Sequence, residues 1–369
     1  MKPQAIKVFF AGLFRHVDGM LLALVLALLL VSTATIFSAS GESAARLTGQ
    51  MLNVLVGLSV LLVVASIPPH LLSKLGLPLY VLALVLLLGV ALFGEIRNGS
   101  RRWLPLGFIS IQPSELMKIA LPLMLAWYFQ QREGLLKLRD FGIAAFLIVL
   151  PFLLILKQPD LGTALLIAAS GFYVLFFAGL SWKIIAGLGA TALACLPLIW
   201  NFVLHDYQKT RVLTLIDPTA DPLGDGYHII QSTIAIGSGG WFGKGWLSGT
   251  QNQLDFIPER TTDFIFAVYS EEFGLLGTLL LIMLYLAIVA RGLKIAEHAP
   301  STFARLMAAT ISLNFFTYVF VNMGMVSGIL PVVGVPLPLM SYGGTAMVTL
   351  MIGLGILMSM ATHRQLLKS

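Results

Sequence analysis

The stretch Gly19–Phe37, GMLLALVLALLLVSTATIF, decides the fold class, because it carries no charge over a length that can cross a membrane as one helix. The hydrocarbon core of a bilayer is about 30 Å thick and takes roughly 20 apolar residues as an α-helix. Backbone polar groups cannot stay unpaired in lipid, so only helices and closed barrels span it. This run is continuous rather than alternating, which predicts a helix and excludes a barrel strand.

The rest of the chain repeats this pattern. Of its 369 residues, 58% are hydrophobic and 11% are charged, a composition that excludes an ordinary soluble globular protein. We therefore predict an all-α polytopic membrane protein with about ten transmembrane helices, and no linker or soluble domain breaks 1–369, which we expect to form a single membrane domain. The predicted spans lie near residues 19–39, 48–68, 77–95, 114–130, 141–157, 161–181, 183–204, 264–290, 303–329 and 341–361.

The placement of lysine and arginine predicts the orientation. Basic residues recur in the short loops on one side, such as QQREGLLKLRD, and in the tail THRQLLKS. We assign that side to the cytoplasm, and an even number of spans places both termini there. The first run is too long for a typical signal peptide, so we expect a retained signal-anchor helix. Topology accounts for most of the net charge of +6, which gives no support for a nucleic-acid partner.

Two segments on the opposite, extracytoplasmic side are unusual. One is 95–115, EIRNGSRRWLPLGFISIQPSE, and the other runs from about 205 to 262, between spans 7 and 8. The second is far longer than most connections, and it is not low in complexity. We expect a large folded extracytoplasmic loop with a short helix around Tyr227 to Ile236.

Asp263 lies between this loop and the eighth span, in PERTTDFIFAVYSEE (258–272). It could cap the helix, where the macrodipole favours a carboxylate. It could also be a functional acid facing a wet cavity, because ionisable groups at membrane depth are costly and usually have a function. By the helical period Glu271 and Glu272 point elsewhere, and one of them could be a structural partner inside the bundle.

Other charged side chains lie at the same predicted depth. Glu115 and Lys118 are neighbours on one helix face, and they form either a local ion pair of little weight or part of a compensated buried site. Arg101 and Arg102, beside Trp103, are either part of an aromatic belt or a clamp for a diphosphate, since arginine binds phosphate oxygens bidentately.

Three further polar groups extend this outer set. Lys209 and Arg211 follow the seventh span, on the side where topology does not call for cations. Asp160 follows a proline in KQPDLGTA, which turn chemistry alone could explain. The segment VGVPLPLMSYGGT (333–345) is either a Pro/Gly-rich loop or a backbone-lined rim with Ser341 and Thr345 as donors.

These charges gather near the outer surface. They predict one polar cavity that opens outward and holds a carboxylate with several phosphate-binding cations. A transporter is expected to place its charges nearer the midplane, at broken helices. Cys195, the single cysteine, stands in an apolar run, and no Cys/His metal spacing exists.

The motifs resemble the SEDS family (shape, elongation, division and sporulation), and the resemblance covers nearly the whole chain. It rests on NGSRRWLPLG, QPSELMK, QPDLGTA, HDYQKTRV, DPLGDGYHIIQSTIAIGSGG, GKGWLSGTQNQLDFIPERTTDFIFAVYSEEFG and NMGMVSGILPVVGVPLPLMSYGGT. It implies a ten-span peptidoglycan glycosyltransferase of the bacterial cytoplasmic membrane. Such an enzyme polymerises lipid II on the outer face during cell elongation, together with a class B penicillin-binding protein.

The resemblance also implies roles for individual residues. The family's essential acid lies in TDFIFA, here Asp263, and the matching basic positions are Arg101, Arg102, Lys118 and Arg211. Asp263 would be the general base, and the cations would neutralise the diphosphate of the polyprenyl-linked glycan donor. A divalent cation could assist, but the sequence offers no ligand set. Two alternatives remain open: a lipid II flippase that uses the same cavity, and a non-catalytic scaffold that activates the penicillin-binding protein.

Overall fold

The computed structural model describes residues 15–363, except 98–99, 106–109, 135, 205, 222–223 and 258. Within this part, eight helices are long and apolar enough to cross a membrane, so the predicted all-α polytopic class is confirmed. Two further predicted spans correspond to the helices α5 (Pro113–Gln130) and α7 (Leu161–Phe177), and the total of ten stays a prediction. The eight are α2 (Gly19–Ala39), α3 (Ala44–Ala65), α4 (Pro69–Phe93), α6 (Leu138–Leu156), α8 (Trp182–Leu198, continued by the π-helix η1, Ile199–Val203), α12 (Ile265–Glu297), α13 (Thr302–Val326) and α14 (Gly344–Thr362).

Two helices extend well beyond the predicted spans. α4 begins at Pro69 rather than near residue 77, and α12 ends at Glu297 rather than near residue 290. Proline suits the first helical position, and long basic side chains such as Lys74 and Lys294 can reach out to the interface. The apolar run therefore marks the membrane-facing part of each helix, while the hydrogen-bonded helix continues past it.

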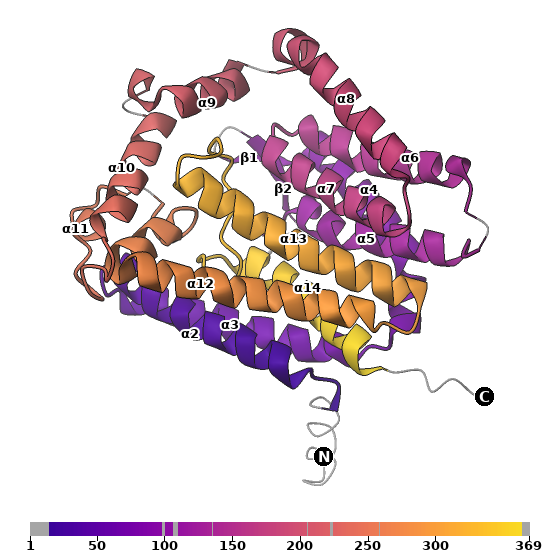
Figure 1. Cartoon of the computed structure of the whole chain (residues 1–369), viewed down its shortest axis with the longest axis horizontal. Helices are drawn as coiled ribbons and strands as arrows, with labels where there is room; N and C mark the ends of the chain where they lie inside the picture. Colours follow the sequence, from indigo (N-terminus) through magenta and orange to yellow (C-terminus); the bar gives the residue numbers. More distant parts are fainter. Residues whose placement is uncertain are drawn as a thin grey trace.

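α5 occupies the centre of the bundle. It packs against α4, α6, α7, α13 and α14, and its side chains are buried on nearly all sides. α8 is the opposite case: it has no buried residue, and Figure 1 shows it extending from the edge of the bundle. Its exposed leucines, such as Leu193 at 68%, suit contact with lipid.

The two ends of the described chain meet on one side of the bundle. The rings of His16 and His363 stack with centroids 3.9 Å apart, and Figure 1 shows the start of α2 and the end of α14 on this side, which we call the terminal side. The long loop lies at the other end, the loop side. The arrangement supports an even number of crossings; the basic N-terminal residues and the tail beyond His363 lie outside the described residues.

A small antiparallel sheet on the loop side was not predicted. β1 (Glu95–Arg97) pairs with β2 (Ser100–Pro105), which pairs with β3 (Ser110–Ile111). The register sets Glu95 opposite Trp103 and Leu104 opposite Ile111. The sheet fixes the arginine-bearing strand β2 at the start of α5.

The long loop is folded, as predicted. It contains α9 (Asp206–Ile216), the 3-10 helix η2 (Pro218–Ala220), α10 (Asp225–Ser238) and α11 (Thr250–Gln253), and α10 confirms the helix expected around Tyr227 to Ile236. Figure 1 shows α9 and α10 arching over the loop side. Side chains bind the loop to the bundle: Ser232 Oγ donates to the Val326 carbonyl at 2.8 Å, and Asn252 Nδ2 donates to the Ser38 carbonyl at 3.0 Å.

The same loop supplies hydrogen-bond partners for the backbone groups at a break inside α12. Gly274 has a φ of 63° and interrupts the helix. Two N–H groups of the loop donate to the last carbonyls of the first half, and two loop carbonyls accept from the first N–H groups of the second half. The bonds join Lys244 to Glu271, Gly245 to Glu272, Leu275 to Gly240 and Leu276 to Trp241.

Two glycines make this contact possible. A Cβ on Gly274 would lie 2.3 Å from the nitrogen of Gly243, and a Cβ on Gly243 would lie 2.0 Å from the carbonyl oxygen of Glu272. Gly243 also has a positive φ of 80°. Only glycine fits both positions, because any side chain would collide with backbone.

Candidate functional site

Asp263 lies in the turn Thr261–Phe264 that precedes α12, and the backbone of this turn is fixed from three directions. The Asp263 carbonyl accepts from Asn322 Nδ2 at 2.8 Å. The Thr262 carbonyl accepts from Ser341 Oγ at 2.6 Å, and the Thr261 carbonyl accepts from the N–H of Tyr342 at 2.8 Å. The backbone of the turn is therefore fixed by other residues, and the carboxylate of Asp263 is not needed to hold it.

The carboxylate of Asp263 does not cap the helix. The N-cap residue of α12 is Phe264, which has no side-chain capping bond. Asp263 is partly buried, and no hydrogen bond or ion pair joins its carboxylate to another described residue. Of the two interpretations left open by the sequence, helix capping is absent from the structure, and a functional role of Asp263 stays a prediction.

The environment of Asp263 favours its neutral form. Burial raises the pKa of its carboxyl to about 6, and the negative charge of Glu259 acts in the same direction. Oδ2 faces Gly334, where a Cβ would lie 3.5 Å away. A carboxylate with a pKa this close to neutrality accepts a proton more readily than an ordinary aspartate.

Asp263 lines a pocket of about 530 Å³ together with Thr262, Ser341 and Tyr342. A second pocket, of about 770 Å³, lies between α5, α7, α13 and α14 and contains Glu115 and Lys118. Pro336, Ala346 and Leu350 line both pockets, so the two spaces are neighbours across these side chains.

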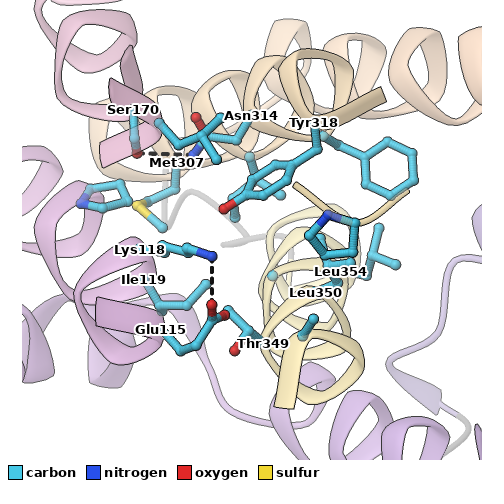
Figure 2. A pocket seen from close by; sticks show the side chains of 17 residues that line it. Glu115, Lys118, Ile119, Ser170, Met307, Asn314, Tyr318, Thr349, Leu350 and Leu354 are labelled. Atoms are coloured by element: carbon cyan, nitrogen blue, oxygen red, sulfur yellow. Dashed lines mark hydrogen bonds and ion pairs between the residues drawn. The ribbon is translucent and has the colours of Figure 1, made fainter. Parts of the chain in front are cut away.

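Glu115 and Lys118 form the predicted ion pair on α5. Lys118 Nζ lies 2.6 Å from Glu115 Oε1, and the two side chains are only 15% and 16% exposed. Lys118 Nζ is also 5.2 Å from the ring centroid of Tyr318. Figure 2 shows the hydroxyl of Tyr318 directed toward Lys118, with Asn314 bound to Ser170 across the pocket at 2.9 Å. Because both side chains are largely removed from water, the attraction between their charges is screened less than in a pair on the surface.

A third pocket, of about 430 Å³, groups Arg102, Asp160 and Arg211 from β2, α7 and α9. Arg102 Nε lies 3.5 Å from Asp160 Oδ2, and its Nη2 donates to the Pro159 carbonyl at 2.9 Å. Asp160 also caps α7, because its Oδ1 accepts from the N–H of Thr163 at 3.1 Å. The turn chemistry considered for Asp160 is thus present, and an arginine contact is present beside it.

The segment 331–336 forms the wall that these pockets share. Pro331 and Val333 line the pocket of Arg102, Gly334 lies against Asp263, and Pro336 lines both other pockets. The sequence predicted one outward-opening cavity; the described residues instead form three adjacent pockets around one Pro/Gly-rich wall.

Three predicted substrate-binding residues line none of these three pockets. Arg101 is exposed, with Nη1 3.4 Å from the Ala91 carbonyl, and Thr345 is exposed at the start of α14. Lys209 lies on α9, outside the lining of the Arg102 pocket. Their role in binding stays a prediction. Ser341 lines the Asp263 pocket, but its hydroxyl already donates to Thr262 and accepts from the N–H of Leu337 at 2.8 Å.

Sequence reasoning missed Arg46 and Asn322. Arg46, on α3, donates to Thr261 Oγ1 at 2.5 Å and lies 5.9 Å from the ring centroid of Tyr342. The sequence could have indicated Arg46, because this arginine lies between the first two predicted spans, on the side where topology does not require a basic residue. Asn322 is a fully buried amide within an apolar span, which by itself marks a functional or structural contact.

The buried acids of α12 have a structural role, as expected for one of them. Glu271 is fully buried, and its Oε1 accepts from Lys244 Nζ at 2.7 Å and from the N–H of Gln251 at 3.0 Å. Glu272 accepts from Ser38. Among the described residues, no cluster of three or more His, Cys, Asp or Glu side chains could hold a metal ion.

Comparison with known proteins gives consistent matches. Residues 15–366 match the family model of FtsW, RodA and SpoVE, described as cell cycle protein. The peptidoglycan glycosyltransferase MrdB of Escherichia coli strain K12 is 52% identical over 352 residues, which cover 95% of each chain. The Helicobacter pylori protein of the same name is 37% identical over 358 residues, covering 95% of this chain and 92% of that protein.

Solved structures agree with these matches. A chain from "Structural coordination of polymerization and crosslinking by a peptidoglycan synthase complex" has a TM-score of 0.80 and 36% identity, covering 93% of this chain and 96% of that one. The rod shape determining protein RodA of Thermus thermophilus has a TM-score of 0.70 and 30% identity, with the same coverage.

Proposed function

Because this chain belongs to the FtsW, RodA and SpoVE family of cell cycle proteins, we propose that it acts as a peptidoglycan glycosyltransferase that polymerises lipid II into β1,4-linked glycan strands during cell elongation. The chain is a multi-pass membrane protein. In the proposal both termini are cytoplasmic, and the loop side with Asp263 faces outward, where the sugars of lipid II are exposed. The observation that carries the proposal is the unpartnered, partly buried carboxylate of Asp263 beside pockets that contain cations.

Asp263 is the proposed general base. The 4-hydroxyl of the acceptor sugar attacks the anomeric carbon of the donor, the carbon–oxygen bond to the diphosphate breaks, and the diphosphate leaves with the electron pair. The hydroxyl proton passes to Asp263. Direct displacement inverts the α-linked donor to a β1,4 bond, and no second carboxylic acid is required to protonate the leaving oxygen. Such base catalysis typically contributes about 10²–10⁴-fold.

The diphosphate needs its charge neutralised. Lys118 in one pocket and Arg102 with Arg211 in another are the proposed contacts. Glu115 and Asp160 hold Lys118 and Arg102 in place in the free protein, and the phosphate oxygens would share these cations. Preformed cations in a partly dry site stabilise developing charge without reorganising at the moment of reaction.

A class B penicillin-binding protein is the proposed partner, and it would crosslink the strands as they form. The related chain in the peptidoglycan synthase complex, whose description pairs polymerisation with crosslinking, supports this assignment. A scaffolding role toward such a partner is compatible with catalysis by this chain.

The test is polymerisation of lipid II by the purified protein with its partner in detergent, the partner's transpeptidase being blocked by a β-lactam. Asp263→Asn should abolish glycan polymer, and Asp217→Asn, an exposed aspartate bonded within its own turn, should not. Polymer made without a membrane excludes a pure flippase, and loss in Asp263→Asn excludes a pure scaffold. Full polymerisation by Asp263→Asn would refute the base assignment.

A further inference from the structure

A basic pocket lies at the opposite end of the molecule from Asp263, and the proposed reaction makes no use of it. It has a volume of about 880 Å³ and is formed where α2, α4, α13 and α14 begin or end. Its lining includes Arg15, His16, His70 and His363, and no aspartate or glutamate among the residues that the structure describes. Three imidazoles and one guanidinium without an acid form a site with unbalanced positive potential whenever the histidines are protonated.

Two helix N-termini add to this potential. α4 begins at Pro69 and has no side-chain cap, and α13 begins beside Ser301. Both starts line the pocket, and the N-terminal end of a helix carries partial positive charge and free N–H groups.

One of the imidazoles that line the pocket has a ring nitrogen with unused hydrogen-bonding capacity. The Nδ1 atom of His16 is buried and has no hydrogen-bond partner among the described residues. Its ring stacks on that of His363 at 3.9 Å with an interplanar angle of 6°. A proton on one stacked imidazole disfavours a proton on the other, and an anion bound beside both rings would offset this repulsion.

The nearby acids are engaged elsewhere. Asp18, which follows His16, is bound by Arg291, with Nε 3.0 Å from Oδ1, and it caps α2 at the N–H of Leu21. Glu133 accepts from the hydroxyl of Thr302 at 2.5 Å. Neither acid lines the pocket. In the free protein, burial and the neighbouring His16 lower the pKa of His363, so its ring is mostly neutral near pH 7.

We propose that this pocket binds a phosphate group, either the headgroup of an anionic phospholipid or a free phosphate. Basic pockets between membrane helices on the cytoplasmic face are suited to anionic headgroups, and the proposed orientation puts this pocket there. A phosphate group beside His363 would offset the effects that lower the pKa of this ring, so binding is coupled to proton uptake by His363. For each proton taken up, affinity falls by about tenfold per pH unit between the pKa of the histidine in the free protein and its higher pKa in the complex.

The test uses the full-length protein in maltoside micelles, which contain no phosphate. The thermal unfolding midpoint is followed while inorganic phosphate or short-chain phosphatidylglycerol is added, against chloride at equal ionic strength. Saturable stabilisation by phosphatidylglycerol alone identifies a lipid headgroup, and stabilisation by inorganic phosphate alone identifies a soluble ligand. Failure of both ligands to stabilise beyond chloride overturns the proposal.

Two further measurements sharpen the test. His16→Gln/His363→Gln should weaken binding by about tenfold or more, whereas His298→Gln, an exposed histidine outside the pocket, should leave it unchanged. Wild-type protein should bind phosphatidylglycerol, a diester of constant charge between pH 6 and 8, more tightly at pH 6. Equal affinity at both pH values, or unchanged affinity in the double variant, contradicts the proposal. Neither result bears on Asp263, so this inference and the proposed function fail separately.

Discussion

Asn322 holds the backbone of Asp263 in place: its Nδ2 donates to the Asp263 carbonyl at 2.8 Å and to the Val335 carbonyl at 2.7 Å. One fully buried amide on α13 therefore joins the turn that carries the acid to the wall that faces it. With the bonds from Ser341 and Tyr342, this contact positions the carboxylate through the backbone rather than through bonds of its own.

Asn322→Leu should lower kcat much more than it changes KM for lipid II. The substitution keeps the branched shape of the side chain, in a larger volume, but leaves two buried carbonyls without their donor, at a cost of about 1–3 kcal/mol in stability. Turnover and KM in the polymerisation assay test this, with Asn201→Ala, an exposed asparagine on η1, as the control. A rise in KM with kcat unchanged would assign Asn322 to substrate binding instead.

The polymerisation rate should rise with pH and reach half its plateau near pH 6. Asp263 acts as a base only when ionised, and its pKa is raised to about 6. Because the charge of Glu259 disfavours that ionised form, Glu259→Gln should move the midpoint to lower pH. Rates at lipid II concentrations well below KM measure this, because they report the pKa of the free enzyme, and Asp255→Asn, an exposed acid paired with Arg260, is the control. A midpoint unaffected by Glu259→Gln argues against Asp263 as the titrating group.

Asp263→Asn should make the protein more stable above pH 6. The folded pKa of about 6 exceeds the ordinary 3.8, so the folded state binds the proton more tightly and loses stability as pH rises between these values. The gain from removing the charge is on the order of 1–3 kcal/mol at pH 8 and vanishes below about pH 4. Unfolding midpoints in detergent at pH 4 and 8 decide this; a less stable variant at pH 8 would contradict it.

Lys118→Met should reduce polymerisation strongly, and Arg101→Ala should do so less, because Lys118 lines the pocket and Arg101 does not. The single Lys118 variant also leaves Glu115 unpaired. Lys118→Met/Glu115→Gln removes that complication: continued loss of activity assigns the effect to the missing cation, and recovery assigns it to the stranded carboxylate. The assay is turnover with lipid II, with folding checked by the unfolding midpoint.

The sequence was sufficient to predict the helices, because each apolar run carries its own signal in its length. The extensions of α4 and α12 were missed, since a helix continues where the side chains turn polar. The sheet of β1, β2 and β3 was also missed, because its strands are short and lack an alternating pattern.

The charged residues were predicted as one set, and the structure divides them. Asp263, Lys118 and Arg102 lie in three pockets because the wall 331–336 passes between them. No local pattern reveals such a division, since it depends on contacts between segments far apart in the chain. The same holds for the break at Gly274, because nothing local in the sequence distinguishes this glycine from Gly277 and Gly292 in the same helix.

That break has a consequence for biogenesis. Residues 240–245 are synthesised before α12, and they supply partners for the backbone groups on both sides of Gly274. In the proposed orientation, the backbone groups at this break can pair only once the loop lies on the outer side of the bilayer with the start of α12. Chain order then implies an order of assembly, in which translocation of the loop precedes completion of the eighth predicted span.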